Sequence, residues 1–159
     1  ALTNAAVAPD SHLVMMLCGV HAANPHELDF ADVFTPLGIE IIESAWDSQP
    51  VHHLNDTIAR LFRLKGPILQ SQPKNFDAWK QAIVRGSAAQ VKPICPVLVC
   101  VDSFEEGTVV PVVWQQAYAT AATALGGVIE VRDYPNDDHF SLPQSCADDS
   151  RAWLTLLIP

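Results

Sequence analysis

The feature that most constrains this fold is a change of hydrophobic period near Pro93. Residues 96–101 form a continuous apolar, largely β-branched run, which is typical of a parallel strand buried on both faces. Residues 111–125 are rich in alanine and predict a helix that the glycine pair 126–127 ends. Residues 128–134 predict a second strand. Strand, helix and strand in this order form a right-handed crossover, so we expect an α/β fold with both strands in one sheet.

The chain before Pro93 shows helical periodicity interrupted by prolines. One apolar run at helical spacing follows Pro50 and ends at Gly66, and another follows Thr35. Asn75 is placed to cap a third helix. The residues expected on the apolar faces of these helices are Ile39, Ile42, Trp46, Val51, Leu54, Ile58, Leu61, Phe62, Phe76, Trp79 and Ile83.

These patterns divide the chain into three segments. Residues 1–18 read as the end of a strand and a link, and because the chain opens without methionine we expect further sequence upstream. Residues 19–92 form a helical segment. Residues 93–159 contain the strand, helix and strand unit and a final helix over residues 144–157, whose apolar stripe is expected to hold Ala152, Trp153, Leu156 and Leu157.

Charge and hydropathy exclude two classes of function. The chain has 18 acidic and 9 basic residues, and a net charge of -9 repels phosphate backbones, so no nucleic-acid partner is expected. No apolar run approaches the roughly 20 residues that span a bilayer, and the first residues lack the pattern of a signal peptide. We therefore expect no membrane span.

The four cysteines, at positions 18, 95, 100 and 146, lack the spacing of metal ligands. Their even number and the low lysine content favour a secreted protein with disulfides. Cys95 and Cys100 flank or lie in an apolar strand, however, where buried free thiols are equally natural. The redox state of the cysteines stays open.

Ionisable residues follow both predicted strands. Asp102, Glu105 and Glu106 follow the first strand, and His139 follows the second. Because the carboxyl ends of parallel strands meet at one edge of a sheet, where open α/β folds bind ligands, we expect an acidic loop and a histidine loop to meet there. Histidine is the usual general base near neutral pH, and a solvated loop histidine is the alternative. The two aspartates directly before His139 are expected to raise its pKa or to cap a turn.

Residues 93–157 contain, in order, the strand PVLVCV, a short acidic loop, TVVP, the alanine-rich helix, GG, a strand that ends in DYP, and DDHFSLP. This order resembles the C-terminal catalytic half of α/β-hydrolases, and within them it is most similar to secretory lipases and esterases. The resemblance implies a partial α/β-hydrolase sheet preceded by a helical cap-like segment. It also implies a triad in the chain order serine, acid, histidine, with the serine on a G-x-S-x-G turn.

For this chain, the resemblance implies that His139 is the general base. It also implies that an acid of the first loop orients the imidazole of His139. Counting from the strand places the acid at Glu105, whereas counting back from Pro111 points to Glu106 or the next glycine. Asp102 is a third candidate, and a solvated loop carboxylate is the alternative for each. The implied reaction is hydrolysis of a small-molecule carboxylic ester through an acyl-enzyme, without a metal or organic cofactor.

The nucleophile itself is missing, because no G-x-S-x-G occurs in the 159 residues. Cys18 precedes the acid and the histidine, but Met16 and Val20 are too large for the nucleophile turn, so a buried thiol is the favoured interpretation. Two hypotheses follow. The chain is a C-terminal fragment of a serine hydrolase whose serine lies upstream, and is inactive alone, or it is a complete but degenerate α/β domain that binds a partner or a small apolar ligand. The missing start and the missing motif favour the fragment.

Two other groups of residues carry weaker signals of a site. The spacing of the histidines does not place two imidazoles on one helix face, so no metal site is expected at His21, His26 and Glu27 or at His52, His53 and Asp56. The glycine pair 126–127 ends a helix instead of preceding one, so no nucleotide is implied.

Overall fold

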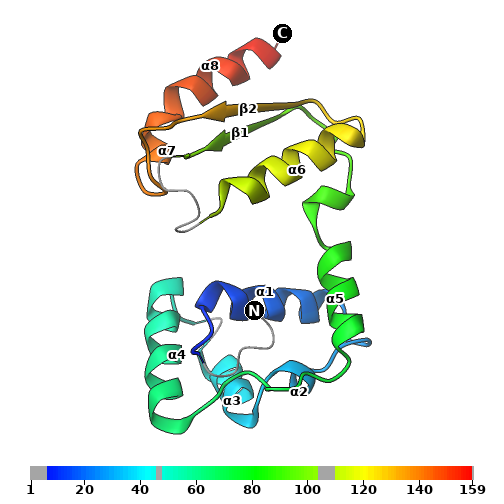
Figure 1. Cartoon of the computed structure of the whole chain (residues 1–159), viewed down its shortest axis with the longest axis vertical. Helices are drawn as coiled ribbons and strands as arrows, with labels where there is room; N and C mark the ends of the chain where they lie inside the picture. The colour runs from blue at the N-terminus through cyan, green and yellow to red at the C-terminus, as the bar shows by residue number, and fades with distance from the viewer. Residues whose placement is uncertain (1–6, 46–47, 104–109, 159) are drawn as a thin grey trace. The chain divides into compact units, whose positions relative to one another are not determined.

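The computed structural model describes residues 7–45, 48–103 and 110–158. Within these ranges the chain is a mixed α/β protein that is mainly helical and has one two-stranded parallel sheet. The expected α/β class is therefore observed. The chain divides into two compact units, Ala1–Gly86 and Ser87–Pro159 (Figure 1). No helix in the described ranges is long and apolar enough to cross a membrane.

The first unit is helical. Residues 11–18, expected above to belong to a strand end and link, lie in its first helix. Asp10 caps that helix by accepting a hydrogen bond of 2.8 Å from the backbone nitrogen of His12. The predicted helices after Thr35, Pro50 and Asn75 are all observed. In chain order the helices are α1 (Ser11–Ala23), α2 (Phe30–Val33), α3 (Pro36–Ala45), α4 (Val51–Lys65) and α5 (Phe76–Arg85).

The ends of these helices follow local chemistry, with one exception. Gly66 ends α4 in a backbone conformation with φ of 103°, which favours glycine. Asn75 precedes α5, but the prediction that its side chain caps the helix is wrong. Its backbone is left-handed, with φ of 47°, and its side-chain amide donates to the carbonyl oxygen of Glu27 at 3.2 Å instead. A tertiary hydrogen bond has replaced the local one.

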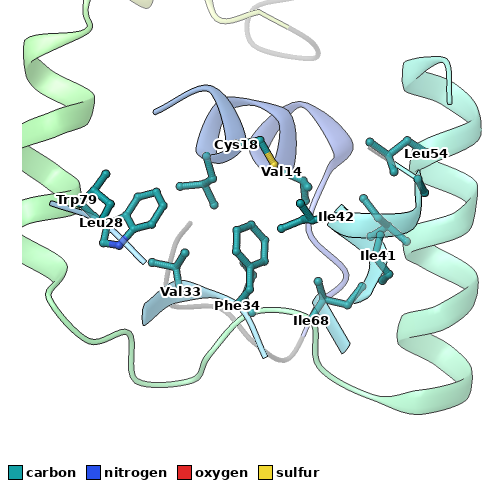
Figure 2. Packing of buried hydrophobic residues seen from close by; sticks show 14 of the residues in the cluster. Val14, Cys18, Leu28, Val33, Phe34, Ile41, Ile42, Leu54, Ile68 and Trp79 are labelled. Atoms are coloured by element: carbon teal, nitrogen blue, oxygen red, sulfur yellow. The ribbon is translucent and has the colours of Figure 1, made fainter. Parts of the chain in front are cut away.

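The core of the first unit lies between its helices (Figure 2). Trp79, Phe34 and Leu54 are fully buried, and Figure 2 shows the side chains of Trp79 and Phe34 within the cluster. Phe76, the first residue of α5, was expected on its buried face but is 38% exposed. The buried residues of the cluster are Val14, Leu17, Cys18, Leu28, Val33, Phe34, Ile41, Ile42, Ala45, Leu54, Ile58, Ile68, Leu69, Trp79 and Ala82.

Two helical glycines in this unit have opposite surroundings and predict opposite effects of substitution. A Cβ on Gly38 of α3 would collide with the carbonyl oxygen of Ile68 and lie 3.0 Å from Cδ1 of Phe34. A Cβ on Gly19 of α1 would meet nothing within 4 Å. We expect Gly38→Ala to lower the free energy of unfolding by about 1–3 kcal/mol through overpacking. Gly19→Ala should raise it by about 0.5–1 kcal/mol, because alanine favours the helix.

Urea unfolding followed by circular dichroism measures both glycine variants against the unaltered chain. Equal effects of the two substitutions would contradict the close approach of α3 to the segment that contains Ile68.

The second unit contains the predicted parallel pair. Strand β1 (Val97–Val101) pairs with strand β2 (Ile129–Asp133) in the register Val97 with Ile129 through Val101 with Asp133. The prediction that both segments share one sheet is confirmed. The crossover between them is α6 (Val112–Ala124), and the unit also contains η1 (Ala88–Gln90), α7 (Leu142–Ser145) and α8 (Ala147–Leu157).

Residues alternate between the two faces of this sheet. Val131 lines a groove with Ala119 and Thr123 of α6, so it lies on the α6 face. The preceding residue, Glu130, accepts a hydrogen bond from Trp153 of α8 and therefore lies on the other face. Helices α6 and α8 thus cover opposite faces of the sheet, as Figure 1 also shows.

The final helix differs from the prediction of one element over residues 144–157. It is interrupted at Cys146, which ends α7 and precedes α8. The expected apolar stripe is only partly covered, because Trp153 is half-buried whereas Leu156 is 82% exposed and Leu157 is 44% exposed. The sheet in the described residues has two strands, which are too few to cover the whole helix face.

Candidate functional site at the carboxyl end of the sheet

The two strands end side by side, and polar residues follow both. Asp102 comes directly after β1 and is only 6% exposed. The hydroxyl of Ser103 donates to Oδ2 of Asp133 at 2.9 Å, and the backbone nitrogen of Tyr134 donates to the carbonyl oxygen of Val101 at 2.8 Å. The acidic loop and the histidine loop therefore start next to each other at one edge of the sheet, as the strand order predicts.

His139 lies in a tight turn after β2 and is exposed. Its ring meets that of Phe140 edge-on, with the ring centroids 5.3 Å apart. The carboxylate of Asp138 accepts hydrogen bonds of 2.8 Å from the backbone nitrogens of Phe140 and Ser141. The backbone amides of Ser141 and Phe140 lower the pKa of Asp138, because they stabilise its charged form. Asp138 thus caps the turn that presents His139 to solvent, which is one of the two roles predicted for it.

Asp137 fixes the other side of the same turn. Its Oδ1 accepts hydrogen bonds of 2.7 Å from the hydroxyls of Ser141 and Ser145. The two aspartates before His139 are therefore engaged with the backbone and the hydroxyls that follow it.

The acid that would orient His139 is not fixed by the described residues. Glu105 and Glu106 lie outside the described residues, and Asp102 is the one candidate whose position is known. No hydrogen bond joins the ring of His139 to a carboxylate within residues 7–45, 48–103 and 110–158. The structure thus places the histidine and the start of the acidic loop at one edge without selecting the acid.

A polar network on the α8 face, which was not predicted from the sequence, supports this edge. The hydroxyl of Tyr134 donates to Oδ2 of Asp149 at 2.8 Å, and Nε1 of Trp153 donates to Oε2 of Glu130 at 2.9 Å. Desolvation and the hydrogen bond to Asp149 raise the pKa of Tyr134 to about 12, so the phenol stays protonated and donating. The sequence does contain a signal for this network. Polar residues occupy every second position of β2, at Glu130 and Arg132, and α8 has acidic residues in its first turn.

The position of Cys18 does not support its role as a nucleophile. Cys18 lies inside α1, is 2% exposed and belongs to the core of the first unit. Burial raises the pKa of its thiol to about 11, so the nucleophilic thiolate is scarce at neutral pH. Cys18 is a core residue.

Two of the residues named as possible metal ligands, His21 and Glu27, have other contacts. The ring of His21 stacks on Phe30 with the centroids 3.9 Å apart, and Glu27 pairs with Arg85 at 2.8 Å. The described part of the chain contains no group of three or more His, Cys, Asp or Glu side chains that could hold a metal ion.

No protein-family model matches this sequence, and comparisons with curated proteins and with solved structures find no significant match either. The function must therefore be argued from the residues of the site. Their arrangement offers an exposed imidazole, held by a capped turn, beside the start of an acidic loop.

Proposed function

We propose that residues 93–159 supply the acid and the histidine of a Ser-His-acid triad in a carboxylic ester hydrolase of the esterase or lipase type. The serine nucleophile comes from a segment outside these 159 residues. The observation that carries the proposal is that the His139 turn and the acidic loop follow adjacent parallel strands at the same edge. This matches the order of acid and histidine in the α/β-hydrolases that the sequence resembles.

In this mechanism His139 removes the proton of the serine hydroxyl as the serine attacks the ester carbonyl. Protonated His139 then gives that proton to the leaving alcohol, and an acyl-enzyme forms. Water, deprotonated by His139, releases the acid product. Glu105, Glu106 or Asp102 holds the imidazole in the working tautomer and stabilises its positive charge. The substrate is a small-molecule ester, and no cofactor takes part.

The incomplete covering of strand β1 supports the proposal that the nucleophile lies on another segment. Parallel sheets are ordinarily covered on both faces and paired on both sides of a central strand. Four of the five residues of β1 are nevertheless only half-buried, and no strand of the described residues pairs with its outer edge. Strands added beside β1 would bury this apolar run. A strand that carries the serine turn would then end at the same edge as His139.

The alternative is a non-catalytic α/β domain that binds a small apolar ligand or a partner, and one observation favours it. An open groove of about 480 Å³ lies between β2 and α8, and its lining is apolar apart from Glu130: Pro96, Val128, Ile129, Glu130, Trp153, Leu156 and Leu157. Val128 and Ile129 lie at the amino end of β2, so the groove opens at the end of the sheet opposite to His139. A ligand bound there would not need the histidine.

The test compares two proteins on 4-nitrophenyl butyrate. We expect background hydrolysis from the 159-residue chain, which lacks the serine and the backbone N–H of the oxyanion hole that follows it. The coding sequence upstream of Ala1 is expected to encode a G-x-S-x-G turn. The protein extended to include this turn should hydrolyse the ester, and a fluorophosphonate should label its serine.

Robust turnover by the 159-residue chain would contradict a nucleophile on another segment. An extended protein that neither reacts with the fluorophosphonate nor hydrolyses esters would favour the binding domain.

A further inference from the structure

Two cysteines of the second unit lie close together on the α8 face of the sheet. Cys100 is on β1, and its Sγ lies 4.0 Å from Oγ of Ser150 in α8. The backbone nitrogen of Ser150 donates to the carbonyl oxygen of Cys146 at 2.9 Å, so Cys146 lies one helical turn before Ser150. Cys146 is the N-cap of α8, and residues four apart share one face of a helix, so Cys146 starts on the side of α8 that Ser150 presents to Cys100.

The Cys146 thiol, whose Sγ lies 3.8 Å from the carbonyl oxygen of Pro143, also affects the ionisation of Cys100. The pKa of Cys100 is raised by burial and then by its contact with the Cys146 thiol. Both side chains are half-buried, so solvent and small molecules reach them. The other two cysteines differ, because Cys18 is buried in the first unit and Cys95 is exposed before β1 begins.

We propose that Cys100 and Cys146 form a reversible disulfide, which ties β1 to the start of α8, by exchange with a small-molecule disulfide. The inference does not depend on the proposed hydrolase function. Cys100 lies two residues before Asp102, and Cys146 follows the turn that contains His139. The bond would therefore join the two chain segments that flank the candidate site.

The reaction balances as two exchange steps. The thiolate of one cysteine attacks a sulfur of the small disulfide, forms a mixed disulfide and releases one small thiolate. The thiolate of the second cysteine attacks the protein sulfur of the mixed disulfide, forms the bond between Cys100 and Cys146 and releases the second small thiolate. Two protein thiols are oxidised, one small disulfide is reduced to two thiols, and the two cysteine protons pass to the released thiolates.

The experiment incubates the 159-residue chain with glutathione disulfide near pH 8, stops exchange with acid, and blocks free thiols with N-ethylmaleimide in denaturant, which exposes the buried Cys18. We expect an intact mass that lacks two hydrogen atoms and carries two maleimide groups, with peptide mapping that links Cys100 to Cys146. The thermal unfolding midpoint of the second unit should rise by about 10 °C, and dithiothreitol should reverse this rise.

Two variants test the pairing. Cys146→Ser should hold glutathione as a mixed disulfide on Cys100 and should lose the rise in the midpoint. Cys95→Ser, the matched control, should still form the bond. Mapping of the unaltered chain decides the question even if a variant fails to fold. A bond from Cys100 to Cys95, or no bond within the chain, would overturn the proposal.

Discussion

Replacing His139 by alanine is expected to lower kcat/KM for ester hydrolysis by roughly 10⁴–10⁶-fold in the protein that carries both this segment and the serine. In the proposed triad, loss of the imidazole would remove the general base and leave the serine hydroxyl unactivated, so proton transfer and nucleophilic attack would fail together. The measurement is steady-state hydrolysis of 4-nitrophenyl butyrate by the upstream-extended protein and its variant.

The fold should not change in this variant. His139 is exposed and its turn is held by Asp137 and Asp138, so the unfolding midpoint of His139→Ala should equal that of the unaltered protein. His53→Ala is the matched control, because His53 is also exposed but lies on α4 in the first unit. It should keep full activity. Full activity of His139→Ala would remove the triad assignment.

The acid of the triad is decided by the same assay. Glu105→Gln should lower the rate less than His139→Ala if Glu106 or Asp102 can orient the ring in its place. A double variant of both glutamates should then lose more activity than either single variant. Asp102 is buried, so its exchange for asparagine needs a parallel stability measurement.

Replacing Trp79 by alanine is expected to lower the free energy of unfolding of the first unit by about 3–5 kcal/mol. Trp79 is fully buried in the core of that unit, and truncation to alanine leaves a cavity there. Its Nε1 has no hydrogen-bond partner among the described residues. Trp79→Phe removes this unpaired donor and leaves a smaller cavity, so it should cost on the order of 1 kcal/mol.

Phe76→Ala is the matched control for Trp79, because Phe76 lies on the same helix and is 38% exposed. It should cost less than about 1 kcal/mol. Urea unfolding, with amide hydrogen exchange in α1 and α5 to follow the first unit separately, measures all three variants. A cost for Trp79→Ala no larger than that for Phe76→Ala would contradict the core described above.

Local patterns in the sequence predicted most of the elements. The helices from α3 to α6 and both strands follow from apolar spacing and from prolines and glycines at their ends, because these features act over a few neighbouring residues. The meeting of the two loops also followed from the sequence, because adjacent parallel strands must end at the same edge. The turn at His139 could be anticipated from the aspartates before it, which accept hydrogen bonds locally.

Only the tertiary structure decided which surfaces are covered and which distant side chains meet. The side chain of Asn75 is a strong capping group by itself, yet it bonds to Glu27, which is far away in the sequence. The apolar periodicity of α8 is the same whether or not a sheet covers it, and Leu156 is exposed because the described sheet has two strands. Cys100 of β1 lies 4.0 Å from the hydroxyl of Ser150 in α8, a contact between distant segments that no local spacing encodes.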